Sequence, residues 1–300
     1  MNAKRGLSEV KLCSTFRELN PTTQCYIQDV IKILNHHIGI DAITSLILFG
    51  SQVRNSDTKI SDCDLLIIVK DETPGRLITI LREHLLTLEI RYQFLEYSNK
   101  NPLSSILFAI QRTTGMFVSH FITKKTNFTQ GRFYKIFSVN RVFTKLLAPK
   151  KLVLLNVIDN SAVIYGEDMR GEVKGQFSDS FFIFDVIKSL LMNLTISVFS
   201  LVLIPFKKLD PIKYVLEAVK WSLKSVHFYI FHKSKPMEKM LARISYIYSS
   251  YHRSESIERF CKKFLELRHN PRLDLVFMMQ APLRIIEIHI NAFKTALSFL

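Results

Sequence analysis

The chain has 300 residues, 48% of them hydrophobic, so it can bury a sizeable core and is not a disordered protein. This length suits two domains. The net charge of +15 favours polyanionic partners. The four cysteines form no CxxC pair, which argues against a disulfide scaffold or a cysteine zinc site. The first residues lack the apolar core of a signal peptide, so we expect a cytoplasmic protein with reduced thiols.

The first elements along the chain are a helix and two strands. Residues 1–20 are typical of an N-terminal extension. Residues 22–37 predict a helix, because apolar side chains recur at helical spacing, at Ile27, Val30, Ile31 and Leu34. The apolar runs 43–49 and 62–69 predict strands.

Polar residues at the adjoining ends of these strands predict a phosphate and metal site. Gly50 allows the backbone to approach a ligand closely, and Ser51 adds a hydroxyl and an amide. Side chains alternate along a strand, so Asp62 and Asp64 point to one side and Cys63 to the other. Two close carboxylates repel each other unless a cation lies between them, and Mg²⁺ binds one or two carboxylates together with substrate phosphates.

This arrangement of Gly50-Ser51, a spacer, and Asp62-Cys63-Asp64 between apolar residues resembles the signature of the polymerase-β-like nucleotidyltransferase superfamily. It is most similar to the minimal and kanamycin-type members. A weaker similarity is the apolar run that ends in Tyr165-Gly166, after which a helical domain often follows. The resemblance covers residues 25–170.

The resemblance implies an α+β fold with a small mixed sheet and the transfer of a nucleoside monophosphate from an NTP, with ATP favoured, to an acceptor hydroxyl. Asp62 and Asp64 would be the catalytic ligands of Mg²⁺ or Mn²⁺, and Gly50 and Ser51 would bind the phosphates. Arg54 could reach a phosphate. The acceptor stays open between a small alcohol, an antibiotic, a protein hydroxyl and an RNA 3′ end.

One part of the family pattern is missing. Members usually add a third carboxylate from a later strand, but the next predicted strand, 116–122, contains none. There His120 or Ser119 would take its place. If 88–97 were the strand instead, Glu89 or Glu96 could supply the acid, although the periodicity favours a helix from residue 75 onward. The alternative function is therefore a catalytically degenerate nucleotide-binding or antitoxin-like module.

The segment 97–158 contains no Asp or Glu but many cations. Aromatic residues are interleaved with them, at Phe121, Phe128, Phe133, Tyr134, Phe137 and Phe143. This pattern fits either a surface for RNA or another polyanion, or core aromatics beside an ordinary wet face. We expect most of the aromatics to be core.

The second half of the chain predicts a helical bundle. Residues 152–158 and 162–165 close the first domain, and the glycines of 166–175 predict a linker, so we divide the chain into 21–170 and 171–300. Helices are expected at 181–203, 211–231, 237–248, 255–268 and 282–300.

Two features of this half have alternative interpretations. Residues 181–204 are long enough to span a membrane, but Asp185, Lys188 and several polar residues favour a buried central helix, so a membrane partner is not expected. Arg284 and His289 have the spacing found in HEPN ribonuclease domains, although the residue after Arg284 is apolar.

Overall fold

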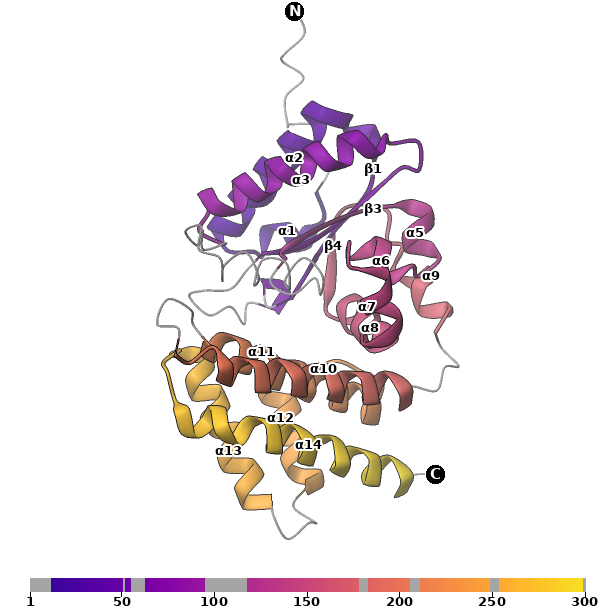
Figure 1. Ribbon diagram of the computed structural model, residues 1–300. Coiled ribbons are helices and arrows are strands. Elements are labelled where there is room, and N and C mark those ends of the chain that lie inside the picture. Colours follow the sequence, from indigo (N-terminus) through magenta and orange to yellow (C-terminus); the bar gives the residue numbers. More distant parts are fainter. Residues whose placement is uncertain are drawn as a thin grey trace, which may run out of the picture. The chain divides into compact units, whose positions relative to one another are not determined.

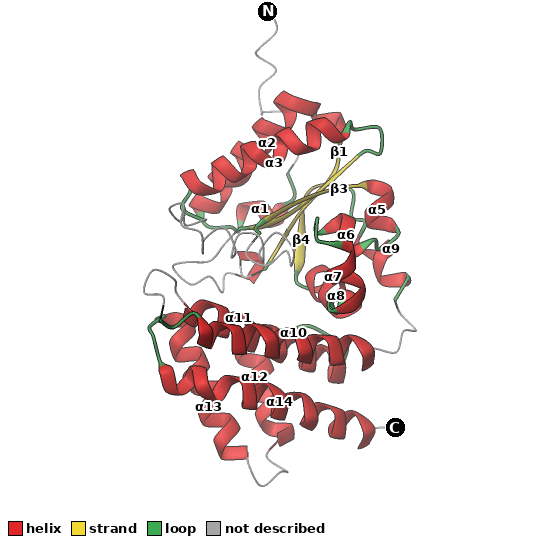
Figure 2. Cartoon of the chain, viewed as in Figure 1, coloured by secondary structure: helices red, strands yellow, loops and turns green. Residues whose placement is uncertain are grey.

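The computed structural model describes residues 12–50, 52–54, 63–94, 118–177, 183–205, 211–248 and 254–298 (Figure 1). The chain forms two compact units. The sheet unit is Met1–Phe143 with Asn160–Asp179, and the helical unit is Thr144–Asp159 with Ser180–Leu300. The predicted α+β class, with a mixed sheet followed by helices, is confirmed (Figure 2).

The sheet unit is built on four strands in the order β3-β2-β1-β4. β1 (Ile43–Phe49) pairs antiparallel with both β2 (Asp64–Val69) and β4 (Ser161–Gly166), whereas β2 pairs parallel with β3 (His120–Lys124). Every residue of β1 is buried, which explains why five of its seven residues are apolar. The third strand begins later than predicted.

Helices α2 (Pro21–Ile38) and α3 (Gly75–Arg91) cover one face of the sheet (Figure 1). Asn20 caps α2 by accepting a hydrogen bond from the backbone N–H of Thr23, and Pro21 suits the first helical turn. The core between helices and sheet contains side chains from all these elements, among them Tyr26, Ile31, Leu34, Leu46, Leu65, Ile67, Leu81 and Leu85.

The opposite face of the sheet is covered by aromatic residues. The ring of Phe121 stacks on Phe49 at a centroid distance of 6.1 Å and meets Phe137 edge-on at 5.1 Å. Two short helices supply the remaining contacts, α5 (Lys125–Thr129) and α6 (Phe133–Ile136). Phe121, Phe128, Phe133 and Phe137 are buried, which confirms that most of these aromatics are core.

The ends of the sheet unit are more ordered than predicted. In the N-terminal segment, α1 (Ser14–Arg17) buries Phe16, and the backbone N–H of Cys13 donates to the carbonyl of Ile164. The predicted linker 166–175 is wrong in its second half, because residues Arg170–Gly175 form α9 and its Val173 is fully buried. Spaced glycines there do not interrupt this short helix.

The helical unit comprises six helices among its described residues, α8 (Lys150–Asp159), α10 (Ile183–Val202), α11 (Pro211–Phe231), α12 (Met237–Tyr248), α13 (Ser254–His269) and α14 (Leu275–Ser298). α7 (Arg141–Leu146) crosses from one unit to the other. Residues 144–159 belong to the helical unit, although the predicted boundary at residue 170 placed them in the first domain. The division of the chain into domains at residue 170 stays a prediction.

α8 is tied into the bundle by polar side chains. Asp185 Oδ2 accepts hydrogen bonds from the backbone N–H groups of Lys151 and Leu152, at 2.6 and 3.3 Å. At its other end, the hydroxyl of Ser234 donates to Asn156 and the backbone N–H of Ser234 donates to Asp159. The bonds to Asp185 satisfy backbone N–H groups in the first turn of α8, which have no acceptor within the helix.

α14 begins seven residues before the predicted start at Pro282. Asp274 Oδ1 accepts a hydrogen bond from the backbone N–H of Phe277, which starts the helix at Leu275 and places Pro282 inside it. The helix was predicted to begin at this proline, whereas the aspartate eight residues earlier is the cap.

α10 is not the buried central helix that its polar residues were expected to indicate. Five of its six buried residues are polar, namely Asp185, Ser189, Asn193, Ser197 and Ser200. Several of its large apolar side chains are exposed instead, at Phe184, Ile187, Leu191, Val198 and Val202. α10 is also long and apolar enough to cross a membrane, with a mean hydropathy of 1.5 and only 33% of the window buried. Hydropathy counts apolar residues but not the side of the helix on which they lie.

Candidate active site

The predicted phosphate and metal motif lies where β1 ends and β2 begins. Phe49, the last residue of β1, pairs with Asp64, the first residue of β2. Gly50 follows with a φ of +87°, a conformation that favours glycine. A Cβ atom at Gly50 would collide with Oδ2 of Asp64, so the backbone and this carboxylate are in close contact. The structure therefore brings Gly50 and Asp64 together.

The loop after Gly50 is anchored by Gln52, which sequence reasoning missed. Gln52 is buried, and its Oε1 accepts hydrogen bonds from Asn20 Nδ2 at 2.9 Å and from the Thr23 hydroxyl at 3.1 Å. Both donors lie at the start of α2, so the cap of α2 also holds the loop. The only signal in the sequence is an amide side chain directly after Gly-Ser.

The other predicted site residues are placed only in part. Ser51, Asp62 and the side chain of Arg54 lie outside the described residues, although the backbone of Arg54 belongs to the short 3₁₀ helix Gln52–Arg54. Cys63 is fully buried in the core below α2 and α3, while Asp64 is partly exposed. The predicted alternation of Cys63 and Asp64 is thus confirmed.

His120 does not take the place of a third carboxylate. β2 and β3 are parallel with Leu65 paired to His120, so His120 lies on the helix-covered face, opposite Asp64. There its Nδ1 is 2.6 Å from Oε1 of Glu89 on α3. Both side chains are buried. Glu89 lies in a helix, as the periodicity predicted, and is paired on the side of the sheet away from the motif.

On the face of Asp64, β3 presents Phe121 and Thr123, and Ser119 precedes them. None of these three residues carries a carboxylate that could bind a metal ion. Within the described ranges, which omit Asp62 and Glu96, no group of three His, Cys, Asp or Glu side chains could hold a metal ion. The one carboxylate of the motif that is described, Asp64, still offers the oxygen ligands that Mg²⁺ prefers.

A buried tyrosine lies near the motif. Tyr26 of α2 is fully buried and meets Tyr92 and Phe94 edge-on. Burial raises the pKa of its phenol far above the ordinary value, and the charge of Glu89 adds to this, followed by smaller effects of Cys63 and Asp64. Its hydroxyl has no hydrogen-bond partner among the described residues. Tyr26 therefore stays neutral and acts as a packing residue.

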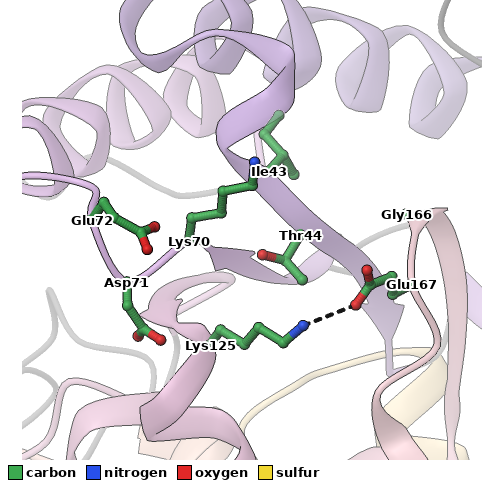
Figure 3. A pocket seen from close by; sticks show the side chains of 8 residues that line it. All are labelled: Ile43, Thr44, Lys70, Asp71, Glu72, Lys125, Gly166 and Glu167. Atoms are coloured by element: carbon green, nitrogen blue, oxygen red, sulfur yellow. Dashed lines mark hydrogen bonds and ion pairs between the residues drawn. The ribbon is translucent and has the colours of Figure 1, made fainter.

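A cavity of about 410 Å³ lies at the opposite end of the sheet (Figure 3). It is lined by the start of β1 and by residues that follow the other strands, namely Ile43, Thr44, Lys70, Asp71, Glu72, Lys125, Gly166 and Glu167. Several of the charged side chains that line the cavity form ion pairs with one another or hydrogen bonds to the backbone. Lys125 Nζ is 3.1 Å from Glu167, and Asp71 accepts a hydrogen bond from the backbone N–H of Thr126. This cavity is separate from the Gly50–Asp64 motif.

The described residues of the basic segment 97–158 do not form one continuous surface of a single unit. Residues up to 117 lie outside the described part, and the rest divides between the two units. Lys124 donates to the carbonyl of Asp71 and Lys125 pairs with Glu167, so both support the local fold. In the sheet unit, Arg132, Lys135 and Arg141 are exposed.

The HEPN-like spacing does not form a ribonuclease site in this structure. His289 is fully buried, and its Nδ1 contacts the carbonyl of Ile285 in its own helix. Arg284 pairs with Glu287 at 2.5 Å and bonds to Ser256. Burial lowers the pKa of His289 to about 4, so it stays neutral at physiological pH.

Comparison with known proteins supports the resemblance. Residues 28–119 match the family model "Polymerase beta, Nucleotidyltransferase". The fold is similar to that of the spectinomycin adenyltransferase AAD(9) from Enterococcus faecialis, determined with ATP and spectinomycin, with a TM-score of 0.50, 12% sequence identity and coverage of 89% of this chain and 98% of that chain. Comparison with curated proteins gives no match.

Proposed function

Since the chain carries a nucleotidyltransferase domain of the polymerase-β-like superfamily, followed by helices, we propose that it transfers a nucleoside monophosphate from an NTP to an acceptor hydroxyl and releases pyrophosphate. The observation that carries this proposal is the close contact of Gly50 with the Asp64 carboxylate where β1 ends and β2 begins, inside the matched residues. ATP is the favoured donor, because the similar adenyltransferase was determined with ATP. The supply of NTP makes the cytoplasm the proposed location.

In this proposal Asp62 and Asp64 are the ligands of Mg²⁺ or Mn²⁺. The donor set fits such an ion, because carboxylate oxygens and substrate phosphates are sufficient ligands for Mg²⁺. A bound divalent ion would neutralise the triphosphate and lower the pKa of the attacking hydroxyl.

The chain's own residues would position the substrate. Gly50 lets the Asp64 carboxylate lie directly against the backbone, and Ser51 would donate its hydroxyl to a phosphate. Arg54 would bind a phosphate from the following turn. Gln52 would hold this loop in place through Asn20 and Thr23.

NTP binding by the full chain tests the site. We would measure it by calorimetry with Mg²⁺ and with EDTA, for the wild type, Asp62→Ala and Asp64→Ala. The control is Glu72→Ala, which removes an exposed carboxylate just beyond the other end of β2. We expect Mg²⁺-dependent binding that both site variants lose and the control keeps. Binding that survives in both site variants would overturn the assignment.

Turnover tests the chemistry separately. Pyrophosphate release would be measured with ATP and the other NTPs against small hydroxylated acceptors, including spectinomycin and aminoglycosides, and against RNA 3′ ends. We propose a small polar acceptor first, because the similar adenyltransferase was determined with spectinomycin. Pyrophosphate release that depends on both Asp64 and an added acceptor would support the proposed transferase activity.

The second candidate is a nucleotide-binding module without chemistry, and the composition of β3 favours it. No residue of β3 is acidic, and Glu89 is engaged by His120. Metal-dependent NTP binding without release of pyrophosphate for any acceptor would support this candidate. Binding of RNA by the exposed cations of the sheet unit, weakened in Arg132→Ala and Lys135→Ala, would then identify the partner.

A further inference from the structure

α10 has the reverse of the usual arrangement for a helix on a protein surface. Such helices bury an apolar stripe and expose polar residues. In α10 the line that faces the bundle is polar and small, and the exposed line contains Phe184, Ile187, Leu191, Val198 and Val202. Phe184 is 73% exposed and Val202 is 59% exposed. An exposed apolar stripe of this length marks a contact surface.

The buried side of α10 shows how the helix is held. Ser189 bonds to Ser225 of α11 at 2.8 Å, and Asn193 Nδ2 donates to Ser189 at 3.1 Å. Small and hydroxyl-bearing residues at a helix–helix contact, with apolar residues outward, are typical of helices that face lipid. Only flanking residues of α10, such as Leu190 and Ile196, pack on the apolar core of the bundle.

The charge of the helical unit indicates what covers the stripe. Lys and Arg outnumber Asp and Glu by about two to one in residues 144–159 and 180–300. Lys188 lies near the start of α10, and the sequence continues after the helix with Lys207 and Lys208. No acidic residue occurs between Asp185 and Asp210. An apolar stripe on a unit with a two-to-one excess of cations matches an acyl boundary below anionic headgroups.

We propose that the helical unit docks on an anionic phospholipid membrane through the exposed face of α10. The helix would lie along the surface, with Phe184, Leu191 and Val198 in the acyl boundary. Its Asp185 stays on the protein side, bound to the backbone N–H groups that start α8. A second copy of the chain is the competing occupant, and the test separates the two.

The test is co-flotation of the full-length protein with vesicles of phosphatidylcholine alone or of phosphatidylcholine mixed with phosphatidylglycerol. We expect binding to the mixed vesicles, weaker binding at high salt, and little binding to phosphatidylcholine. Leu191→Glu and Val198→Glu should each weaken binding by about tenfold or more, because each puts a charge where an apolar side chain would be buried. Leu191→Gln with Val198→Gln is the milder variant should a charge disturb folding.

The matched control is Tyr246→Glu, an equally drastic change at an 81% exposed position on α12, outside the exposed apolar stripe. It should bind vesicles as the wild type does, and so should Asp64→Ala, which separates docking from catalysis. Absence of binding to the mixed vesicles would overturn the proposal, as would equal binding by the α10 variants and the wild type. A wild-type dimer in light scattering that Leu191→Glu dissociates, without vesicle binding, would assign the stripe to a second copy instead.

Discussion

Glu89 of α3 and His120 of β3 are paired on the helix-covered face of the sheet, with Oε1 2.6 Å from Nδ1 and side-chain exposures of only 2% and 7%. The contact links a helix to an edge strand across the core that supports the Gly50–Asp64 motif. The pairing also gives a structural role to two of the four residues, His120 and Glu89, that were considered for the position of a third carboxylate.

Removing one partner of this pair should destabilise the sheet unit. We expect His120→Ala to lower the free energy of unfolding by roughly 3–5 kcal/mol, because it leaves a buried carboxyl without a partner. The double variant His120→Phe/Glu89→Leu should recover much of this loss. Urea unfolding of the three proteins measures both effects. A double variant as unstable as the single one would contradict the interpretation.

Gly50→Ala should abolish metal-dependent NTP binding. The added Cβ would meet the Asp64 carboxylate, and a residue with a side chain in this backbone conformation is strained by roughly 1–2 kcal/mol. Gly75→Ala is the matched control, because nothing lies within 4 Å of its added Cβ at the start of α3. Calorimetric titration with ATP and Mg²⁺ compares them. Unchanged affinity in Gly50→Ala would argue against a phosphate site here.

Acid should destabilise the helical unit through two buried histidines. Burial lowers the pKa of both His227 and His289 to about 4, below the value near 6.5 that the unfolded chain has. The unfolded state therefore binds more protons, so the stability contribution is complete above pH 6.5 and is lost as pH falls toward 4. Each residue accounts for a few kcal/mol at most.

Thermal unfolding across this pH range tests the prediction. His289→Leu should flatten the dependence of the melting temperature on pH. His269→Gln, at an exposed position on α13, should leave it unchanged. A slope that His289→Leu leaves intact would show that other groups titrate on unfolding.

Asp185 stabilises α8 as a hydrogen-bond acceptor rather than as a charge. Burial raises the pKa of this carboxyl, although the N–H groups of Lys151 and Leu152 oppose the shift. Because this carboxyl ionises less readily in the folded protein than in the unfolded chain, its contribution to the free energy of unfolding falls as pH rises above the ordinary pKa near 3.8. We expect Asp185→Ala to cost about 1–2 kcal/mol at pH 7 and Asp185→Asn to cost little, since the amide oxygen still accepts. Chemical unfolding distinguishes the two, and equal losses would show that the charge itself is needed.

The strands that carry the motif were predictable because their signals are local. The run Ile43–Phe49 matches β1 residue for residue, and the second strand differs from its prediction only at its start. Pro211 and the residues around it likewise predict α11 with its observed bounds. In each case turn or cap residues flank a long apolar pattern, so the local sequence is sufficient.

The errors arose where tertiary contacts decide. The side on which His120 lies follows from the register of β3 with β2, which no local pattern encodes. Which side of α10 is buried also depends on packing: Asn193, Ser197 and Ser200 point into the bundle, while Leu191 and Val198 are exposed. Gln52 has no periodic signal at all, because its role depends on the distant cap of α2.

The assignment of α8 to the bundle has a practical consequence for dissecting the protein. The chain passes between the two units at residues 143/144, 159/160 and 179/180, so no single cut separates them. A fragment that ends at residue 170 would keep α8 but lose its partners Asp185 and Ser234, leaving helix donors and apolar side chains in water. The complementary fragment would lack one of its helices. Neither half is therefore expected to fold well alone, so the two units should be expressed and assayed together as the full chain.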